Sequence, residues 1–192
     1  MVLWGYFQEE VIEILITTHL TIAKSCYKAC SKIMDLKLDK KAFLYGAIEP
    51  DLHKHKNKIN HTYNVSIIRI REYIDKIKNE ELTIKEESFL LGNIAHYIAD
   101  CFCKYHLEEN YGKNMIDHFC YEFFLDYKLN KAILTKKYLV STIIFNIDDE
   151  CRDYLEELKV NREKYLTLNE HCLNDLYYTI KTTSMLLVYM CK

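Results

Sequence analysis

Proline and glycine are scarce in this chain of 192 residues, which contains one Pro and four Gly. Folds built on β-sheets need more turn residues than this, so the scarcity favours helices joined by short loops. A strong excess of charge is also missing, because 26 basic and 28 acidic side chains give a formal net charge of −2. The chain therefore lacks the positive charge by which many proteins neutralise nucleic-acid phosphates.

Export and membrane signals are not evident in the sequence. Glu9, Glu10 and Glu13 interrupt the first apolar stretch, and no basic segment precedes it, unlike a secretion signal. No run of about eighteen apolar residues could span a bilayer. We therefore expect a cytoplasmic protein in which the eight cysteines stay reduced.

Length and apolar periodicity predict one all-α domain over residues 1–192. The residues are 49% apolar, and the chain shows no internal repeat and no Pro- or Ser-rich linker. A capping box at Thr83 and Glu86 marks the start of one helix. Apolar positions at helical spacing place the helices at about 17–34, 40–48, 67–79, 83–103, 115–129, 148–165 and 169–190. Residues 51–61 are expected to form a polar, His-rich loop after Pro50.

Two His/carboxylate pairs indicate a metal site. His96 and Asp100 are four residues apart, His118 and Glu122 repeat this spacing, and His106 lies between the pairs. On a helix this spacing places both side chains of a pair on one face, where they can reach the same cation. One pair is expected by chance, but two pairs with a fifth residue between them are not. Imidazole and carboxylate ligands together suit zinc.

Other interpretations of these residues remain open. Each His could be a core or surface histidine with ordinary partners, and each carboxylate could be a solvated charge. His96 and Asp100, however, lie beside the apolar stripe of their helix rather than on it, which favours the ligand interpretation. Cys101 and Cys103 could also bind metal, but we favour packing for both because the His/carboxylate set is complete without them.

The order of these residues resembles the zinc-dependent phospholipase C family over residues 4–122. The most specific segments are Gly46-Ala-Ile-Glu-Pro-Asp51 and His96-Tyr-x-x-Asp100. The resemblance implies an all-helical domain, of a type shared with single-strand nucleases, that holds three zinc ions in a cleft. It implies one zinc on Asp51, His61, His96 and Asp100, a second on His106, His118 and Glu122, and a third on His19 shared with Asp100. It also implies that Asp51 orients or deprotonates the attacking water.

The N-terminus departs from the family pattern. Secreted members begin with a Trp whose free amine and carbonyl complete the third zinc. Trp4 lies fifteen residues before His19, but Met1-Val2-Leu3 precede it here. We therefore expect two or three zinc ions. The expected partner is a phospholipid, reached by transient contact of the helical domain itself with a membrane surface, because the chain ends without a lipid-binding β-domain.

Two other functions compete with phospholipid hydrolysis. Single-strand-specific nucleases use a related trinuclear site and stack bases on aromatic side chains, and this chain has 16 Tyr and 8 Phe. The chain could also be a non-catalytic relative that binds zinc, because it lacks the free N-terminal Trp. The near-neutral charge favours the lipid substrate over the nucleic acid.

Overall fold

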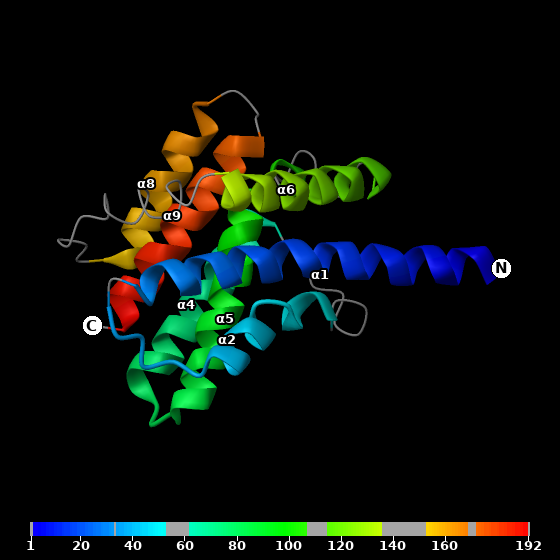
Figure 1. Ribbon diagram of the computed structural model, residues 1–192. Helices are drawn as coiled ribbons and strands as arrows, with labels where there is room; N and C mark the ends of the chain where they lie inside the picture. Colours follow the sequence, from blue (N-terminus) through cyan, green and yellow to red (C-terminus); the bar gives the residue numbers. More distant parts are fainter. Residues whose placement is uncertain are drawn as a thin grey trace.

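The computed structural model describes residues 2–32, 34–52, 62–106, 115–135, 153–168 and 172–191 (Figure 1). The elements are α1 (Val2–Cys30), α2 (Lys40–Gly46), α4 (Tyr63–Asn79), α5 (Ile84–Cys101), the 3-10 turn η1 (Lys104–His106), α6 (Met115–Thr135), α8 (Tyr154–Leu166) and α9 (Cys172–Met190). These ranges contain no strand, so the all-α prediction is confirmed. Within them, no helix combines the length and apolar character needed to cross a membrane.

Helix α5 lies among α1, α2, α4 and α9 and carries the His96/Asp100 pair. It packs against α2, α4 and α9 (Figure 1), and every residue from 90 to 101 is buried. The predicted capping box is present at its start. The Thr83 N–H donates to the Glu86 carboxylate at 2.9 Å, and the Glu86 N–H donates to the Thr83 hydroxyl oxygen at 3.3 Å. These bonds satisfy backbone N–H groups that a helix start otherwise leaves unpaired.

Two glycines allow α2 and α5 to touch through their backbones. A Cβ added to Gly46 would lie 2.1 Å from the Phe89 carbonyl oxygen, and one added to Gly92 would lie 2.1 Å from the Phe43 carbonyl oxygen. Any side chain at either position would force the helices apart. This contact brings Ala47, which follows α2, against the middle of α5.

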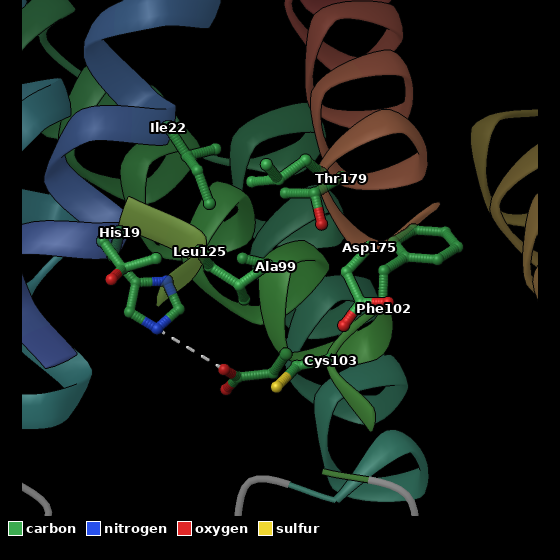
Figure 2. Close-up of a pocket in the computed structure, with 11 residues that line it drawn as sticks. His19, Ile22, Ala99, Phe102, Cys103, Leu125, Asp175 and Thr179 are labelled. Carbon is green, nitrogen blue, oxygen red and sulfur yellow. Dashed lines mark ion pairs between the residues drawn. The ribbon is translucent and has the colours of Figure 1, made fainter. Parts of the chain in front are cut away.

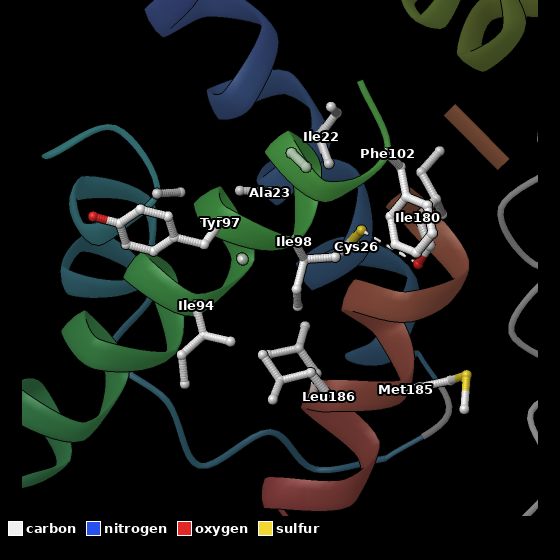
Figure 3. Packing of buried hydrophobic residues seen from close by; sticks show 14 of the residues in the cluster. Ile22, Ala23, Cys26, Ile94, Tyr97, Ile98, Phe102, Ile180, Met185 and Leu186 are labelled. Atoms are coloured by element: carbon white, nitrogen blue, oxygen red, sulfur yellow. Dashed lines mark hydrogen bonds between the residues drawn. The ribbon is translucent and has the colours of Figure 1, made fainter. Parts of the chain in front are cut away.

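Helices α1 and α9 close the core on the other side of α5. Figure 3 shows Ile94 and Ile98 of α5 facing Leu186 of α9, with Ile22 of α1 nearby. The buried Cys26 and Cys30 thiols donate to carbonyl oxygens of α9 at 3.9 Å. Burial raises the pKa of the Cys30 thiol to about 11, so it stays protonated in the core.

Several expected helix boundaries are wrong. The helix expected to begin near Thr17 begins at Val2, because no Pro or capping residue interrupts the preceding segment, and it ends at Cys30 rather than near 34. His19 is therefore in the middle of the helix rather than near its start. Helix α6 extends to Thr135, past the expected end at 129, and α8 begins at Tyr154 rather than near 148.

The segment around Pro50 also differs from the prediction. Helix α2 ends at Gly46, and residues 49–52 form a further helical turn instead of the start of a loop. Proline is accepted in the first turn of a helix, where its missing N–H is not needed. The turn holds Asp51 in a buried position.

Candidate metal centre

Two imidazoles and two carboxylates from three parts of the chain converge in the protein interior. His19 comes from α1, Asp51 from the turn at 49–52, and His96 and Asp100 from α5, and each is at most 7% exposed. His96 Nε2 lies 3.4 Å from Asp100 Oδ2 and 3.9 Å from Asp51 Oδ1. His19 Nε2 lies 3.6 Å from both Asp51 Oδ2 and Asp100 Oδ1. Each carboxylate thus faces both imidazoles.

The separations suit ligands of a shared cation. Hydrogen bonds from N–H to oxygen usually span about 2.7–3.2 Å, which is shorter than these distances. Two ligands of a tetrahedral zinc ion, each about 2.0–2.1 Å from the metal, lie about 3.3–3.4 Å apart. One ligand atom from each of His19, His96 and Asp100 lies within 4.8 Å of the others. The donor types, the burial and the spacing therefore fit zinc.

The contact between α2 and α5 orients the His96 ring. His96 Nδ1 lies 3.2 Å from the Ala47 carbonyl oxygen. A carbonyl oxygen can only accept, so Nδ1 carries a hydrogen, and Nε2, which faces Asp51 and Asp100, is the nitrogen left to bind a cation. A backbone acceptor behind a histidine ligand fixes its tautomer and its direction. Gly46 and Gly92 thus act on the site by allowing Ala47 to reach His96.

The buried carboxylates of Asp51 and Asp100 favour a positive charge on His96. Burial alone would lower the pKa of His96, but the charges of Asp100 and Asp51 outweigh that effect and raise its pKa to about 9. In the metal-free protein the imidazole therefore carries the balancing charge as a proton near neutral pH. Binding of a cation would displace that proton, as is usual for histidine ligands.

Asp100 is the central carboxylate of the arrangement. His106, which is 3% exposed at the end of η1, places its Nε2 3.7 Å from Asp100 Oδ1. The same oxygen faces His19, while Oδ2 faces His96. A carboxylate with different imidazoles on its two oxygens can bridge two cations, which an imidazole cannot do while neutral.

The structure brings five of the eight predicted ligands together: His19, Asp51, His96, Asp100 and His106. His61 lies outside the described residues. His118 and Glu122 lie on α6, but their side chains are outside the described part of the chain. Leu125, one helical turn beyond Glu122, lines the same cavity as His19 and Asp100.

Trp4 cannot complete a zinc site at His19 in this structure. Both residues belong to the continuous helix α1 (Figure 1). At about 1.5 Å per residue, fifteen residues separate them by about 22 Å along the axis. A third ion beside His19 would need other ligands.

Sequence reasoning missed a buried acid beside the centre. A small cavity of about 20 Å³, room for about one water molecule, is lined by His19, Asp100, Cys103 and Asp175 among others (Figure 2). Burial raises the pKa of Asp175 to about 6, although hydrogen bonds from two tyrosines oppose the shift. One signal in the sequence points to it, a single Asp within the apolar and aromatic start of α9. Cys101 and Cys103 are both buried, and packing is the role that we predicted for them.

Comparison with protein families identifies a zinc-dependent family. A family model described as "Zinc dependent phospholipase C" matches residues 18–175, a range that includes all eight predicted ligands. The comparison with curated proteins found no match, and neither did the comparison with solved structures.

Proposed function

Because the chain belongs to the zinc-dependent phospholipase C family, we propose that it is a zinc-dependent hydrolase that cleaves the head-group phosphate from phospholipids. The observation that carries this proposal is the buried convergence of His19, Asp51, His96 and Asp100. Buried charged groups are costly unless something compensates them. A centre with two carboxylates and two imidazoles is therefore more consistent with a bound cation than with a structural core.

The ligand roles follow from the arrangement around Asp100. We assign Asp51, His96 and Asp100, with His61, to one zinc ion. His106, with His118 and Glu122, would hold a second ion that shares Asp100. His19 faces both Asp51 and Asp100, so it would serve either a third ion or the first. The expected content is two or three zinc ions per chain.

Asp51 is the residue that we propose to act on water. Zinc in such a centre supplies positive charge that stabilises the phosphoryl oxygens and makes water a better nucleophile near neutral pH. The Asp51 carboxylate, held by the turn at 49–52, would orient the attacking water and accept its proton. His96, fixed through Ala47, would keep its Nε2 directed at the centre throughout the reaction.

The outer face of α6 supports a lipid substrate. Phe123, Phe124 and Tyr127 are 42–60% exposed on this face. Lys128 Nζ lies 4.8 Å from the Phe124 ring centre, and Lys131 Nζ lies 6.0 Å from that of Tyr127. Aromatic rings flanked by lysines suit the head-group region of a membrane. The same helix bears His118 and Glu122, so contact there would bring the lipid close to the proposed centre.

The test combines metal analysis with substrate assays on purified, zinc-supplemented protein. We expect zinc by mass spectrometry and release of phosphorylated head group from short-chain phosphatidylcholine below its micellar concentration. Asp51→Asn should slow the reaction by about 10²–10⁴-fold. Asp75→Asn, at an exposed position on α4, is the matched control and should not change it.

Other outcomes point to the competing functions. Cleavage of single-stranded DNA or RNA without phospholipid turnover would indicate a single-strand-specific nuclease. Zinc binding with no hydrolysis of either substrate would indicate a non-catalytic relative. Protein that binds no zinc would overturn the proposal entirely.

A further inference from the structure

Asp175 joins three elements that surround the candidate metal centre. Its carboxylate is 3% exposed and lies on the first turn of α9. It accepts a hydrogen bond from the Tyr121 hydroxyl of α6 at 2.5 Å and one from the Tyr165 hydroxyl of α8 at 3.0 Å. The backbone N–H of Lys104, in η1, donates to the same oxygen as Tyr121 at the longer distance of 3.4 Å.

Two of these elements bear ligands that we assign to the second ion. Lys104 opens η1, which ends at His106. Tyr121 directly precedes Glu122 in α6 and follows His118 by three residues. The two elements also touch through Tyr121, because Lys104 Nζ lies 4.5 Å from its ring centre. A single carboxylate thus links the backbone of η1 to the helix of the other two ligands.

The same cluster supports the end of α5. Tyr165 packs edge-on against Phe102 at a ring separation of 5.5 Å and lies 5.2 Å from the Arg162 guanidinium. Arg162 donates a hydrogen bond to the carbonyl oxygen of Cys101, the residue after Asp100. A cation at a helix C-terminus is favourable, because the last carbonyl groups lack partners within the helix. The end of α5, one residue after Asp100, is therefore held by α8 through Arg162.

The cost of burying Asp175 argues for a role beyond packing. A carboxylate among apolar residues destabilises the folded state unless its hydrogen bonds compensate, and hydrophobic residues often do as well or better. We propose that Asp175 is a positioning residue that holds η1 and α6 at the separation that the second zinc ion requires. It acts through Tyr121 and Lys104, and the inference rests on the metal centre of the proposed function.

Zinc affinity separates this role from simple stabilisation. We expect Asp175→Asn and Tyr121→Phe to lower the affinity for the second zinc ion by about 10–100-fold. This is the usual effect of removing a group that supports a metal ligand. The first ion, held by residues on α5 and the turn at 49–52, should keep its affinity. The measurement is competition with a chromophoric chelator on metal-free protein, with thermal unfolding followed in parallel.

A matched control exists on α8. The buried Tyr154 hydroxyl donates to the Thr182 carbonyl oxygen at 3.2 Å, and this bond does not involve η1 or α6. Tyr154→Phe removes a comparable buried hydrogen bond, so it should lower the unfolding temperature while both zinc affinities stay unchanged. If Tyr154→Phe lowered the affinity for the second zinc ion by the same factor, general destabilisation would be the cause and the inference would be overturned.

The remaining outcomes are also decisive. If Tyr121→Phe binds two zinc ions with wild-type affinities, the inference is overturned. This conservative variant keeps the test valid even if Asp175→Asn does not fold. Wild-type protein that binds fewer than two ions would end both the inference and the two-ion assignment. Wild-type protein that binds two ions but leaves phospholipids intact would overturn the substrate proposal alone.

Discussion

Substitution of Gly92 by alanine should damage the candidate metal centre without changing any of the proposed ligands. The added Cβ would lie 2.1 Å from the Phe43 carbonyl oxygen and 2.9 Å from the backbone nitrogen of Ala47. Both are backbone atoms, so no side chain can rotate away. To extend the first contact from 2.1 Å to an ordinary 3.4 Å, α2 must withdraw by about 1.3 Å.

That movement acts on stability and on His96 together. Overpacking costs typically about 1–3 kcal/mol, and a clash between backbones belongs at the upper end. The better helix propensity of alanine offsets about 1 kcal/mol, which leaves a net loss of about 2 kcal/mol in the free energy of unfolding. The bond from His96 Nδ1 to Ala47, now 3.2 Å, would leave hydrogen-bonding range. Loss of such a support typically weakens metal binding by about 10–100-fold.

Urea denaturation of metal-free protein and zinc competition titration measure the two effects separately. Ile94→Ala is the control, because it opens a cavity in the buried face of the same helix at a cost of about 2–5 kcal/mol but leaves the Phe43 and Ala47 contacts intact. It should retain zinc affinity despite its lower stability. A Gly92→Ala protein with wild-type zinc affinity would refute the argument that the helix contact orients His96.

Three further predictions concern charge, lipid and metal. Because the pKa of His96 is raised from 6.5 to about 9, the folded metal-free protein binds its proton more tightly than the unfolded chain. That stabilisation is complete below pH 6.5 and is lost as the pH rises to 9. Urea titrations should therefore show that the free energy of unfolding falls by about 3 kcal/mol between pH 6.5 and pH 9. His96→Asn should remove most of this pH dependence. The double variant Phe124→Ser/Tyr127→Ser should reduce sedimentation of the protein with anionic vesicles, whereas Ile68→Ser, at an exposed site on α4, should not. An equal reduction in both variants would exclude α6 as the membrane-contacting helix. Free zinc at a hundred times its Kd should stabilise the protein by about 2.7 kcal/mol for each bound ion, seen in calorimetry as a higher unfolding temperature that EDTA abolishes.

Local patterns in the sequence were sufficient to predict the fold class and the proximity of His96 and Asp100 on α5. The spacing of His96 and Asp100 fixes their shared direction on a helix, whatever surrounds it. The capping box at Thr83 likewise depends on four consecutive residues. The scarcity of Pro and Gly was a sound guide to the all-helical fold of the described residues.

Features that depend on tertiary contacts were not predictable in this way. The hydrogen bond from Ala47 to His96 joins residues 49 positions apart and exists because two glycines meet. Asp51 lies in a helical turn and not in the expected loop. The residue before a proline usually avoids helical geometry, but Pro50 is accepted in the first turn of a helix. Asp175 was missed because a lone acid shows no spacing pattern, and its partners Tyr121 and Tyr165 come from other helices.

The outward face of α6 also offers a native attachment point for a spectroscopic probe. Among the described cysteines, Cys120 is exposed, Cys191 is half-buried, and Cys26, Cys30, Cys101, Cys103 and Cys172 are buried. Burial raises the pKa of the Cys191 thiol to about 12, which makes it less reactive. Cys120 lies one helical turn before Phe123 and Phe124. A maleimide fluorophore should therefore react with Cys120 before the other described cysteines. A shift of its emission to the blue on addition of vesicles would report immersion of this face in lipid.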